Sequence, residues 1–340
     1  LARDPARRAS SAHDLALELE ELATHSSPSR SSSSAAVAPV VPTLAVLPFA
    51  NRTADDGADF LCDGLAEQIL NTLARLPDLR VLARATCFRF RDRVGEPVEV
   101  GRELGVGAVV TGRVFQVAGR LVVRAELTDV GEGVQLWGDQ FDRPKDDLLA
   151  VQTEIGREVA RALGHRLAPG KRERFERPQT ENPVAYELYL RGKHFLNRRT
   201  VDGMRQAVKL LLEAVAADSR FALAWASLAD AWSLLGRYGG EPPREVMPQA
   251  REAALRALED GEELAEPHVS LGQVIWYYDW DFPAAERELR RGVELNANYA
   301  QGHHWLAFDL AEVGRFDEAE VEIGRALALD PLSLIIQANA

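Results

Sequence analysis

The pattern of apolar positions changes character after about residue 168, where short apolar runs give way to continuous helical spacing. In the first part the pattern predicts strands over residues 43–49, 79–83, 108–117, 121–128 and 134–141, and helices over residues 63–76, 98–104 and 147–167. The strands at 108–117 and 121–128 are joined by so few residues that they must be antiparallel, whereas the earlier strand–helix–strand units favour parallel pairing. The sequence therefore predicts an α/β domain with a mixed sheet over residues 43–168.

A repeat with a period of about 34 residues begins at residue 183. Small residues recur where the helices of each copy cross, because only a hydrogen or a methyl group fits between closely packed helices. They are Gly192, Ala229, Gly272 and Ala307 on the first helices, and Ala207, Ala250, Ala285, Ala319, Ala214, Ala257, Gly292 and Ala326 on the second helices. These spacings are similar to the tetratricopeptide pattern. They predict an all-α solenoid of four repeats over residues 183–340, with a fifth repeat beginning at Leu334.

The tetratricopeptide resemblance implies a concave face built from the first helices, which binds protein or peptide ligands. The residues at the groove positions of that pattern are Tyr186, Tyr189, Lys193, Asp230, Gln273, Trp276, Tyr277, His304, Phe308 and Glu312. For each aromatic residue among them, packing between neighbouring repeats is an alternative role, and the sequence leaves both roles open.

The amino-terminal segment, residues 1–24, reads LARDPARRASSAHDLALELEELAT and has one stretch of helical spacing. It resembles the last helix of the carboxy-terminal lobe of eukaryotic-like protein kinases, with Asp4, Pro5, Arg8 and Ser10 at matching places and Ala9 where the family usually has proline. The resemblance implies a serine/threonine kinase domain upstream, so we expect the chain to be the carboxy-terminal part of a longer protein. The kinase Gly-rich loop, HRD and DFG strings do not occur in residues 1–340. We therefore expect no catalytic residues in this chain, and ATP and magnesium only in the missing domain.

Two segments are predicted to be linkers, residues 25–42, which are rich in serine, alanine and proline, and residues 169–182. Between them, the phrases LAVLPFANRTADD, ELGVGAVVTGRV and LLAVQTEIGREVARAL resemble the TolB-amino-terminal-like domain. In bacteria that domain often lies between a kinase or adenylate cyclase catalytic domain and a helical repeat array. The resemblance implies no enzymatic activity for residues 43–168.

Composition and charge exclude several classes of protein. The chain of 340 residues has a formal net charge of −12, which argues against a nucleic-acid binder. Its two cysteines form no metal-binding or disulfide pattern, so we expect a cytoplasmic setting, no metal site and no cofactor. The longest apolar stretch is interrupted by prolines and is too short to cross a membrane.

The sequence thus predicts a non-catalytic protein–protein interaction and regulatory region of a bacterial serine/threonine kinase, which recruits partners or substrates through the repeat groove. The alternative is that the α/β domain senses a small molecule and controls an attached catalytic domain. An enzymatic role for the α/β domain has no nucleophile–base pair or phosphate-binding loop to support it.

Overall fold

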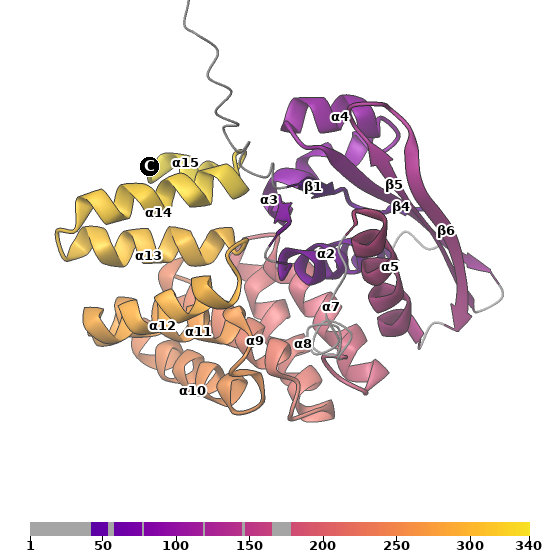
Figure 1. Ribbon diagram of the computed structural model, residues 1–340. Coiled ribbons are helices and arrows are strands. Elements are labelled where there is room, and N and C mark those ends of the chain that lie inside the picture. Colours follow the sequence, from indigo (N-terminus) through magenta and orange to yellow (C-terminus); the bar gives the residue numbers. More distant parts are fainter. Residues whose placement is uncertain (1–41, 54–57, 77, 118–119, 145–146, 165–177) are drawn as a thin grey trace, which may run out of the picture. The chain divides into compact units, whose positions relative to one another are not determined.

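The computed structural model describes residues 42–53, 58–76, 78–117, 120–144, 147–164 and 178–340 (Figure 1). The expected kinase-type helix at residues 1–24 lies outside these residues. So do the linker at residues 25–42 except for its last residue, and most of the linker at residues 169–182.

The strands form one mixed sheet. They are β1 (Thr43–Val46), β2 (Ala50–Asn51), β3 (Arg80–Val81), β4 (Ala108–Val117), β5 (Arg120–Asp129) and β6 (Gln135–Pro144). The order is β3-β1-β4-β5-β6, with β2 paired to β4 off this path. β1 is parallel to both of its neighbours, whereas β4, β5 and β6 are antiparallel. The predicted mixed sheet is confirmed.

The helices of the α/β part are α2 (Asp59–Ala74), α3 (Arg84–Cys87), the 3₁₀ helix η3 (Phe88–Arg93), α4 (Pro97–Leu104) and α5 (Leu148–Ala162). The sequence pattern predicts α2, α4 and α5, although α2 begins earlier and α5 ends earlier than expected. α4 ends at Gly105, whose φ of 65° lies in the left-handed region that glycine adopts without steric strain. α3 and η3 were not predicted, because they are too short to show a helical period.

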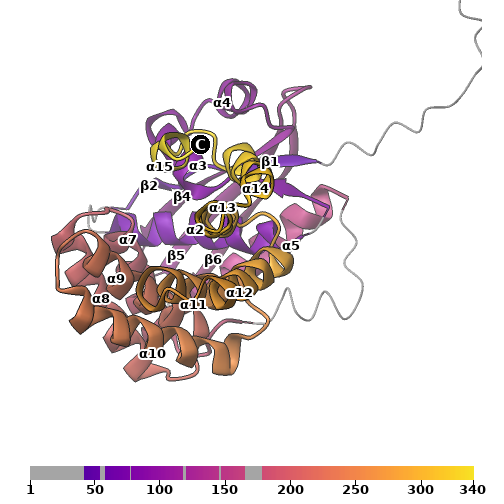
Figure 2. The same cartoon turned by 90° about the vertical axis from the view of Figure 1, so that its left-hand side faces the viewer.

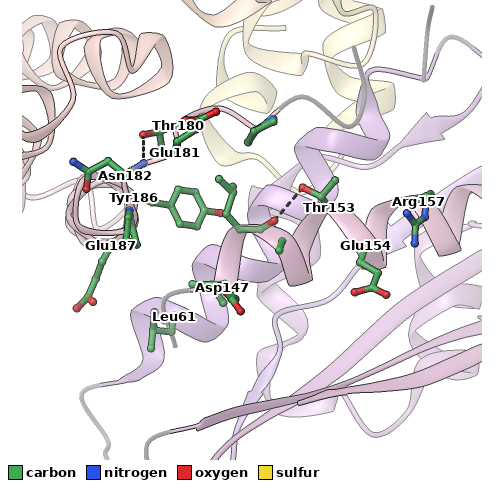
Figure 3. Close-up of a pocket in the computed structure, with 15 residues that line it drawn as sticks. Leu61, Asp147, Thr153, Glu154, Arg157, Thr180, Glu181, Asn182, Tyr186 and Glu187 are labelled. Carbon is green, nitrogen blue, oxygen red and sulfur yellow. Dashed lines mark hydrogen bonds between the residues drawn. The ribbon is translucent and has the colours of Figure 1, made fainter. Parts of the chain in front are cut away.

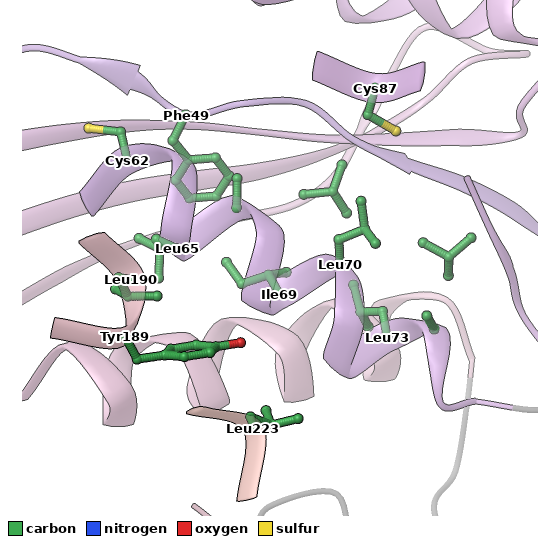
Figure 4. Packing of buried hydrophobic residues seen from close by; sticks show 14 of the residues in the cluster. Phe49, Cys62, Leu65, Ile69, Leu70, Leu73, Cys87, Tyr189, Leu190 and Leu223 are labelled. Atoms are coloured by element: carbon green, nitrogen blue, oxygen red, sulfur yellow. The ribbon is translucent and has the colours of Figure 1, made fainter. Parts of the chain in front are cut away.

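Helix α2 lies between the sheet and the helical array, and 13 of its 16 residues are buried. In Figure 4, Phe49 lies on the sheet side of α2, whereas Tyr189 and Leu190 lie on its opposite side. One hydrophobic core runs through the α/β part and into the first repeats. Because α2 is buried on both sides, it packs against the sheet on one side and against the first repeat on the other.

The array consists of paired helices (Figures 1 and 2). They are α7 (Pro183–Leu196) with α8 (Val201–Ala217), α9 (Ala222–Arg237) with α10 (Pro243–Gly261), α11 (Ala265–Val274) and its π-helical turn η5 (Ile275–Asp279) with α12 (Phe282–Leu295), and α13 (Ala300–Glu312) with α14 (Phe316–Leu329). A short α15 (Leu334–Ala338) follows. The fold class, an α/β mixed-sheet part followed by an all-α tetratricopeptide-type solenoid, is confirmed.

Adding one methyl group at Gly112 should destabilise the sheet. A Cβ atom there would lie 2.4–2.6 Å from three ring atoms of Phe49, which is buried and cannot move aside. Overpacking of this kind costs about 1–3 kcal/mol, so Gly112→Ala should lower the free energy of unfolding by that amount, as measured by urea denaturation. The control is Gly138→Ala on β6, where the added Cβ meets the end of the flexible Gln135 side chain. Equal losses in the two variants would show that the Phe49 contact is not the cause.

Candidate partner-binding groove

The predicted groove residues lie on the first helices of the hairpins, and the structure separates them into two groups. Tyr189 and Lys193 on α7 contact α2, and Tyr186 on the same helix contacts α5; we call this part of the groove the α2-covered half. Gln273, Trp276 and Tyr277 of α11 and η5 lie beside His304 and Phe308 of α13, and we call this part the aromatic half. Asp230 lies on α9, and Glu312 is exposed at the end of α13.

A buried ion pair joins α2 to the α2-covered half. The carboxylate of Glu67 lies 3.3 Å from Lys193 Nζ and 2.8 Å from Arg84 Nε. It also accepts a hydrogen bond of 3.0 Å from the Asn197 amide. Burial by itself raises the pKa of Glu67, but Lys193 and Arg84 outweigh it and hold that pKa below its ordinary value. Glu67 and Lys193 are therefore both charged, and this ion pair holds α2 to the first repeat.

The two tyrosines of this half bond to the α/β part. Tyr189 accepts a hydrogen bond of 3.1 Å from the Gln68 amide of α2, and burial raises its pKa to about 12. Tyr186 donates its hydroxyl to Gln152 of α5. Both tyrosines are buried. The surface that the repeat pattern assigns to a ligand is filled at this end by helices of the same chain.

The last repeats bind the α/β part from the other end. Asn298, which precedes α13, donates from its amide to the carbonyls of Ala74 and Leu79 at 2.8 Å each, and accepts from the backbone N–H of Val81 at 3.2 Å. Asp330 accepts a hydrogen bond of 2.7 Å from Thr86. The array is thus tied to the α/β part at its first and last repeats.

Asp230 occupies the middle of the inner face. It accepts a hydrogen bond of 2.7 Å from the Ser270 hydroxyl of α11. Burial raises its pKa, although this hydrogen bond and the charge of Lys193 act in the opposite direction. Asp230 therefore links neighbouring inner helices and lies close to the ion pair with α2.

Aromatic rings line the aromatic half of the groove. The ring centroid of Trp276 lies 5.9 Å from the centroids of Trp305 and Phe308, and the centroid of His304 lies 5.1 Å from that of Phe308. Trp276, Tyr277 and Phe308 keep part of their surface exposed. These three side chains are therefore accessible to solvent, unlike Tyr186 and Tyr189 in the α2-covered half.

His304 is neutral in this surface. Its Nε2 faces the amide of Asn339 at 3.2 Å, so it accepts that hydrogen bond and the ring proton lies on Nδ1. Burial, together with the charge of Arg237, lowers the pKa of His304 to about 4. His304 adds an aromatic edge to the groove and no charge at neutral pH.

The half-buried Arg237 at the end of α9 was missed by the sequence analysis. Its guanidinium carbon lies 4.1 Å from the ring centroid of Trp305 and 5.3 Å from that of Tyr277. Arg237 makes no ion pair with any residue that the structure describes. It stands outside the groove positions of the repeat pattern, and the only sequence signal was its place before the long turn RYGGEPPREVMP.

Two histidines elsewhere in the array have structural roles. His268 Nε2 donates to the carbonyl of Glu262 at 2.9 Å, and its Nδ1 lies 2.7 Å from Glu288. His303 makes the same pair of contacts, with Ala297 and Glu322. In the second repeat the indole of Trp225 donates to the carbonyl six residues earlier, as each of these histidines does. The histidines therefore replace a tryptophan as the donor that closes the turn between repeats.

The stability of the chain should fall at alkaline pH because of His268. Burial lowers its pKa, but the hydrogen bonds to Glu288 and Glu262 outweigh this effect and raise the pKa above its ordinary value. The stabilising contribution is therefore complete below about pH 6.5 and is lost as the pH rises through the pKa of the folded chain. His268→Gln should lose about 1–3 kcal/mol of unfolding free energy at pH 6 and less at pH 9, as measured by urea denaturation. An unchanged pH dependence in this variant would contradict the assignment.

The two cysteines are buried, and burial raises the pKa of each thiol to about 12. They are therefore unreactive packing residues. Among the residues that the structure describes, no three histidine, cysteine or acidic side chains converge as metal ligands. Nor does any helix in these residues combine the length and apolarity that a membrane span requires.

The paired helices, the small residues at their crossings and the concave inner face define a tetratricopeptide-type helical array joined to a mixed α/β sheet. The chain is 31% identical over 285 residues to a putative adenylate cyclase of Rhizobium meliloti, a match that covers 83% of this chain and 42% of that protein. It is 26% identical over 144 residues to the transcriptional regulator HilA of Salmonella typhimurium, covering 42% of this chain and 26% of the regulator. The chain thus spans less than half the length of these relatives. No family model matches it.

Among solved structures, a thermophilic TPR protein of Thermus thermophilus is similar to this chain with a TM-score of 0.40 and 22% identity. The similarity covers 55% of this chain and 94% of that one.

Proposed function

We propose that this chain is the non-catalytic, partner-recognising region of a larger bacterial signalling protein, and that the aromatic half of the groove binds the partner. One observation carries the proposal: α2 fills one half of the inner face, while the other half leaves Trp276, Tyr277 and Phe308 partly exposed beside Arg237, which has no ion pair with a described residue. Aromatic and arginine side chains of this kind are the residue types that dominate the energy of protein interfaces.

Cross-linking tests this proposal. A photoreactive amino acid placed at Glu312, beside the aromatic half, should capture a partner from lysate of the source organism, and Phe308→Ala should abolish the capture. The control position is Arg287 on the outer helix α12, where no capture is expected. Partners that cross-link only to the α/β part would overturn the assignment of recognition to the groove.

The catalytic domain of the parent protein has two candidates. The resemblance of residues 1–24 to the end of a kinase domain supports a serine/threonine kinase. The relative named as a putative adenylate cyclase supports a cyclase, since its match covers 83% of this chain. Incubating the complete natural protein with ATP separates the two, because a kinase yields phosphoserine or phosphothreonine and a cyclase yields cyclic AMP.

A second candidate function is small-molecule sensing by the α/β part, which we propose on the basis of one pocket. The pocket has a volume of about 580 Å³ and lies between α5, the start of α2 and the start of α7 (Figure 3). Thr153, Arg157 and Asn182 are among the polar residues that line it. A ligand there would touch both the α/β part and the first repeat, so it should raise the melting temperature of the wild-type chain in a metabolite screen. Arg157→Ala should remove that increase, and an equal increase in the variant would place the ligand elsewhere.

A further inference from the structure

The tryptophan that directly follows η5 is unusual in both its backbone and its exposure. Trp280 has a φ of 61°, in the left-handed region that bulky residues rarely adopt. The turns of the second and fourth hairpins have glycine in that region, at Gly239 and Gly314. The side chain of Trp280 is also 73% exposed, so it contributes little to the core. A residue that combines backbone strain with apolar exposure indicates a contact outside the chain.

Trp280 belongs to an apolar surface on two adjacent turns, which lie at the same end of their hairpins (Figure 1). Its ring centroid lies 6.4 Å from that of Phe282, edge to face. The turn between α13 and α14 is followed by Phe316, which is 68% exposed. The turns are adjacent because Arg315 Nη1 lies 2.6 Å from the carboxylate of Glu286 on α12. The exposed and partly exposed apolar residues of the two turns, which we call the turn patch, are Trp280, Phe282, Val313 and Phe316.

Carboxylates border the turn patch. They belong to Asp281, Glu312 and Asp317, each of which is next in the sequence to a residue of the patch. All three are exposed, and none makes an ion pair with a residue that the structure describes. Asp281 instead accepts a hydrogen bond of 3.1 Å from the backbone N–H of Ala284. Their negative charges are therefore available to a ligand.

The arginines of the same turns are already neutralised. Arg251 pairs with Asp279 at 3.2 Å, and Arg315 pairs with carboxylates of α12 and α14 at 2.6 Å each. On α12, Arg287 alone lacks a described carboxylate, and its guanidinium donates to the carbonyl of Pro283. Three carboxylates without an ion pair against one such arginine give the turn patch a negative potential.

These charges and rings favour one kind of ligand. A lysine or arginine side chain over the face of an indole is attracted by the electrons of the ring, and nearby carboxylates add to the attraction. Apolar side chains next to that cation can pack on phenylalanine rings. An anionic membrane surface, which also suits an exposed tryptophan, would be repelled by the carboxylates. The turn patch therefore fits a protein segment that is both basic and apolar.

We propose that the turn patch binds a segment of a partner protein in which a lysine or arginine adjoins apolar side chains, with the cation over the indole of Trp280 and the apolar side chains on Phe282 and Phe316. This surface is separate from the aromatic half of the groove, so the inference goes beyond the proposed function. The ring of Trp280 already contacts Phe282 before binding, so little side-chain entropy is lost when the ligand arrives.

The probe is an array of capped peptides with lysine, arginine, glutamine or glutamate at the centre and mixed apolar flanks. The full chain should bind mainly to the lysine and arginine peptides. In fluorescence anisotropy with the tightest labelled peptide, changing the central residue to glutamine should weaken binding about tenfold, or 1.4 kcal/mol. Trp280→Gly in the chain should weaken binding by about tenfold or more.

The melting temperature of Trp280→Gly separates recognition from a structural role. It should equal or exceed that of the wild type, because glycine adopts a positive φ without strain. Asp317→Asn tests the charges, and it should weaken binding about threefold and reduce the salt dependence of binding. The matched controls are Leu212→Ala and Glu213→Gln, which remove an exposed apolar side chain and an exposed carboxylate from α8 and should leave binding unchanged.

Equal binding of lysine and glutamine peptides, or unchanged binding in Trp280→Gly, would overturn the proposal. If Trp280→Gly lowers the melting temperature, Asp317→Asn and the peptide comparison still decide the question. Loss of binding in Phe308→Ala but not in Trp280→Gly would place the basic segment in the groove instead. Flotation with phosphatidylcholine vesicles detects a membrane, and sedimentation velocity detects a second copy of the chain. Either association, if Trp280→Gly removes it and no lysine peptide binds, would replace the proposed partner.

Discussion

Replacing Glu67 with alanine should lower the free energy of unfolding by about 3–5 kcal/mol, because it leaves the half-buried ammonium of Lys193 without its carboxylate. Glu67 is 5% exposed and also bonds to Arg84 and Asn197, so water cannot replace it at low cost. Urea denaturation followed by circular dichroism measures the loss. Since the pKa of Glu67 is held below its ordinary value, the stabilisation is present above about pH 4.3 and is lost as the pH falls through the pKa of the folded chain.

An exposed ion pair is the control for this prediction. Glu103 lies 2.7 Å from Arg93, and the side chains are 54% and 40% exposed, so Glu103→Ala should cost less than about 1 kcal/mol. The double change Glu67→Gln with Lys193→Met should recover part of the loss, because it removes the charges of Glu67 and Lys193 together, whereas Arg84 still lacks its carboxylate. A loss in Glu67→Ala no larger than that in Glu103→Ala would show that the ion pair does not hold α2 to the array.

Replacing Ala257 with lysine should destabilise the array by about 3 kcal/mol or more. Ala257 is fully buried on α10, so a long side chain overpacks the helix crossing and brings a charge without a partner into it. Differential scanning calorimetry should show a lower melting temperature. Leu255→Lys on the same helix is the matched control, since Leu255 is 48% exposed and the new charge remains in water. Similar melting temperatures for the two variants would mean that α10 does not pack as described.

The architecture could be predicted where local pattern and tertiary structure agree. Alternation and a short connection predict the antiparallel pair β4 and β5, whose register runs from Ala108 opposite Asp129 to Val117 opposite Arg120. Small residues at the helix crossings predict the paired helices of the array. Both signals are local, because each depends on residues only a few positions or one repeat apart.

The environment of α2 could not be predicted from the same signals. The helical spacing of Leu65, Ile69 and Leu73 predicts one buried face, but Glu67 and Gln68 are buried as well. Their partners Lys193 and Tyr189 lie more than a hundred residues further along the chain. A single sequence carries no periodicity that links such distant positions.

The candidate site was predictable only in part. The repeat pattern selects ten inner-face residues by position, but it cannot distinguish Tyr189, which α2 covers, from Trp276, which is partly exposed. It also omits Arg237, because the stacking of that side chain on Trp305 depends on how neighbouring repeats curve.

The contacts of Asn298 and Glu67 have a consequence for the mechanics of the array. A solenoid whose repeats contact only their neighbours is flexible along its length, and bending changes the spacing of its inner helices. Here α2 is held to the first repeat at its middle by Glu67, and to the start of α13 at its carboxyl end by Asn298, which bonds to the carbonyl of Ala74. This attachment limits how far the array can bend, because the first repeat and the start of α13 are both held to the same helix. Loss of either attachment would free the first repeat and α13 to move relative to each other, and the array would become more flexible.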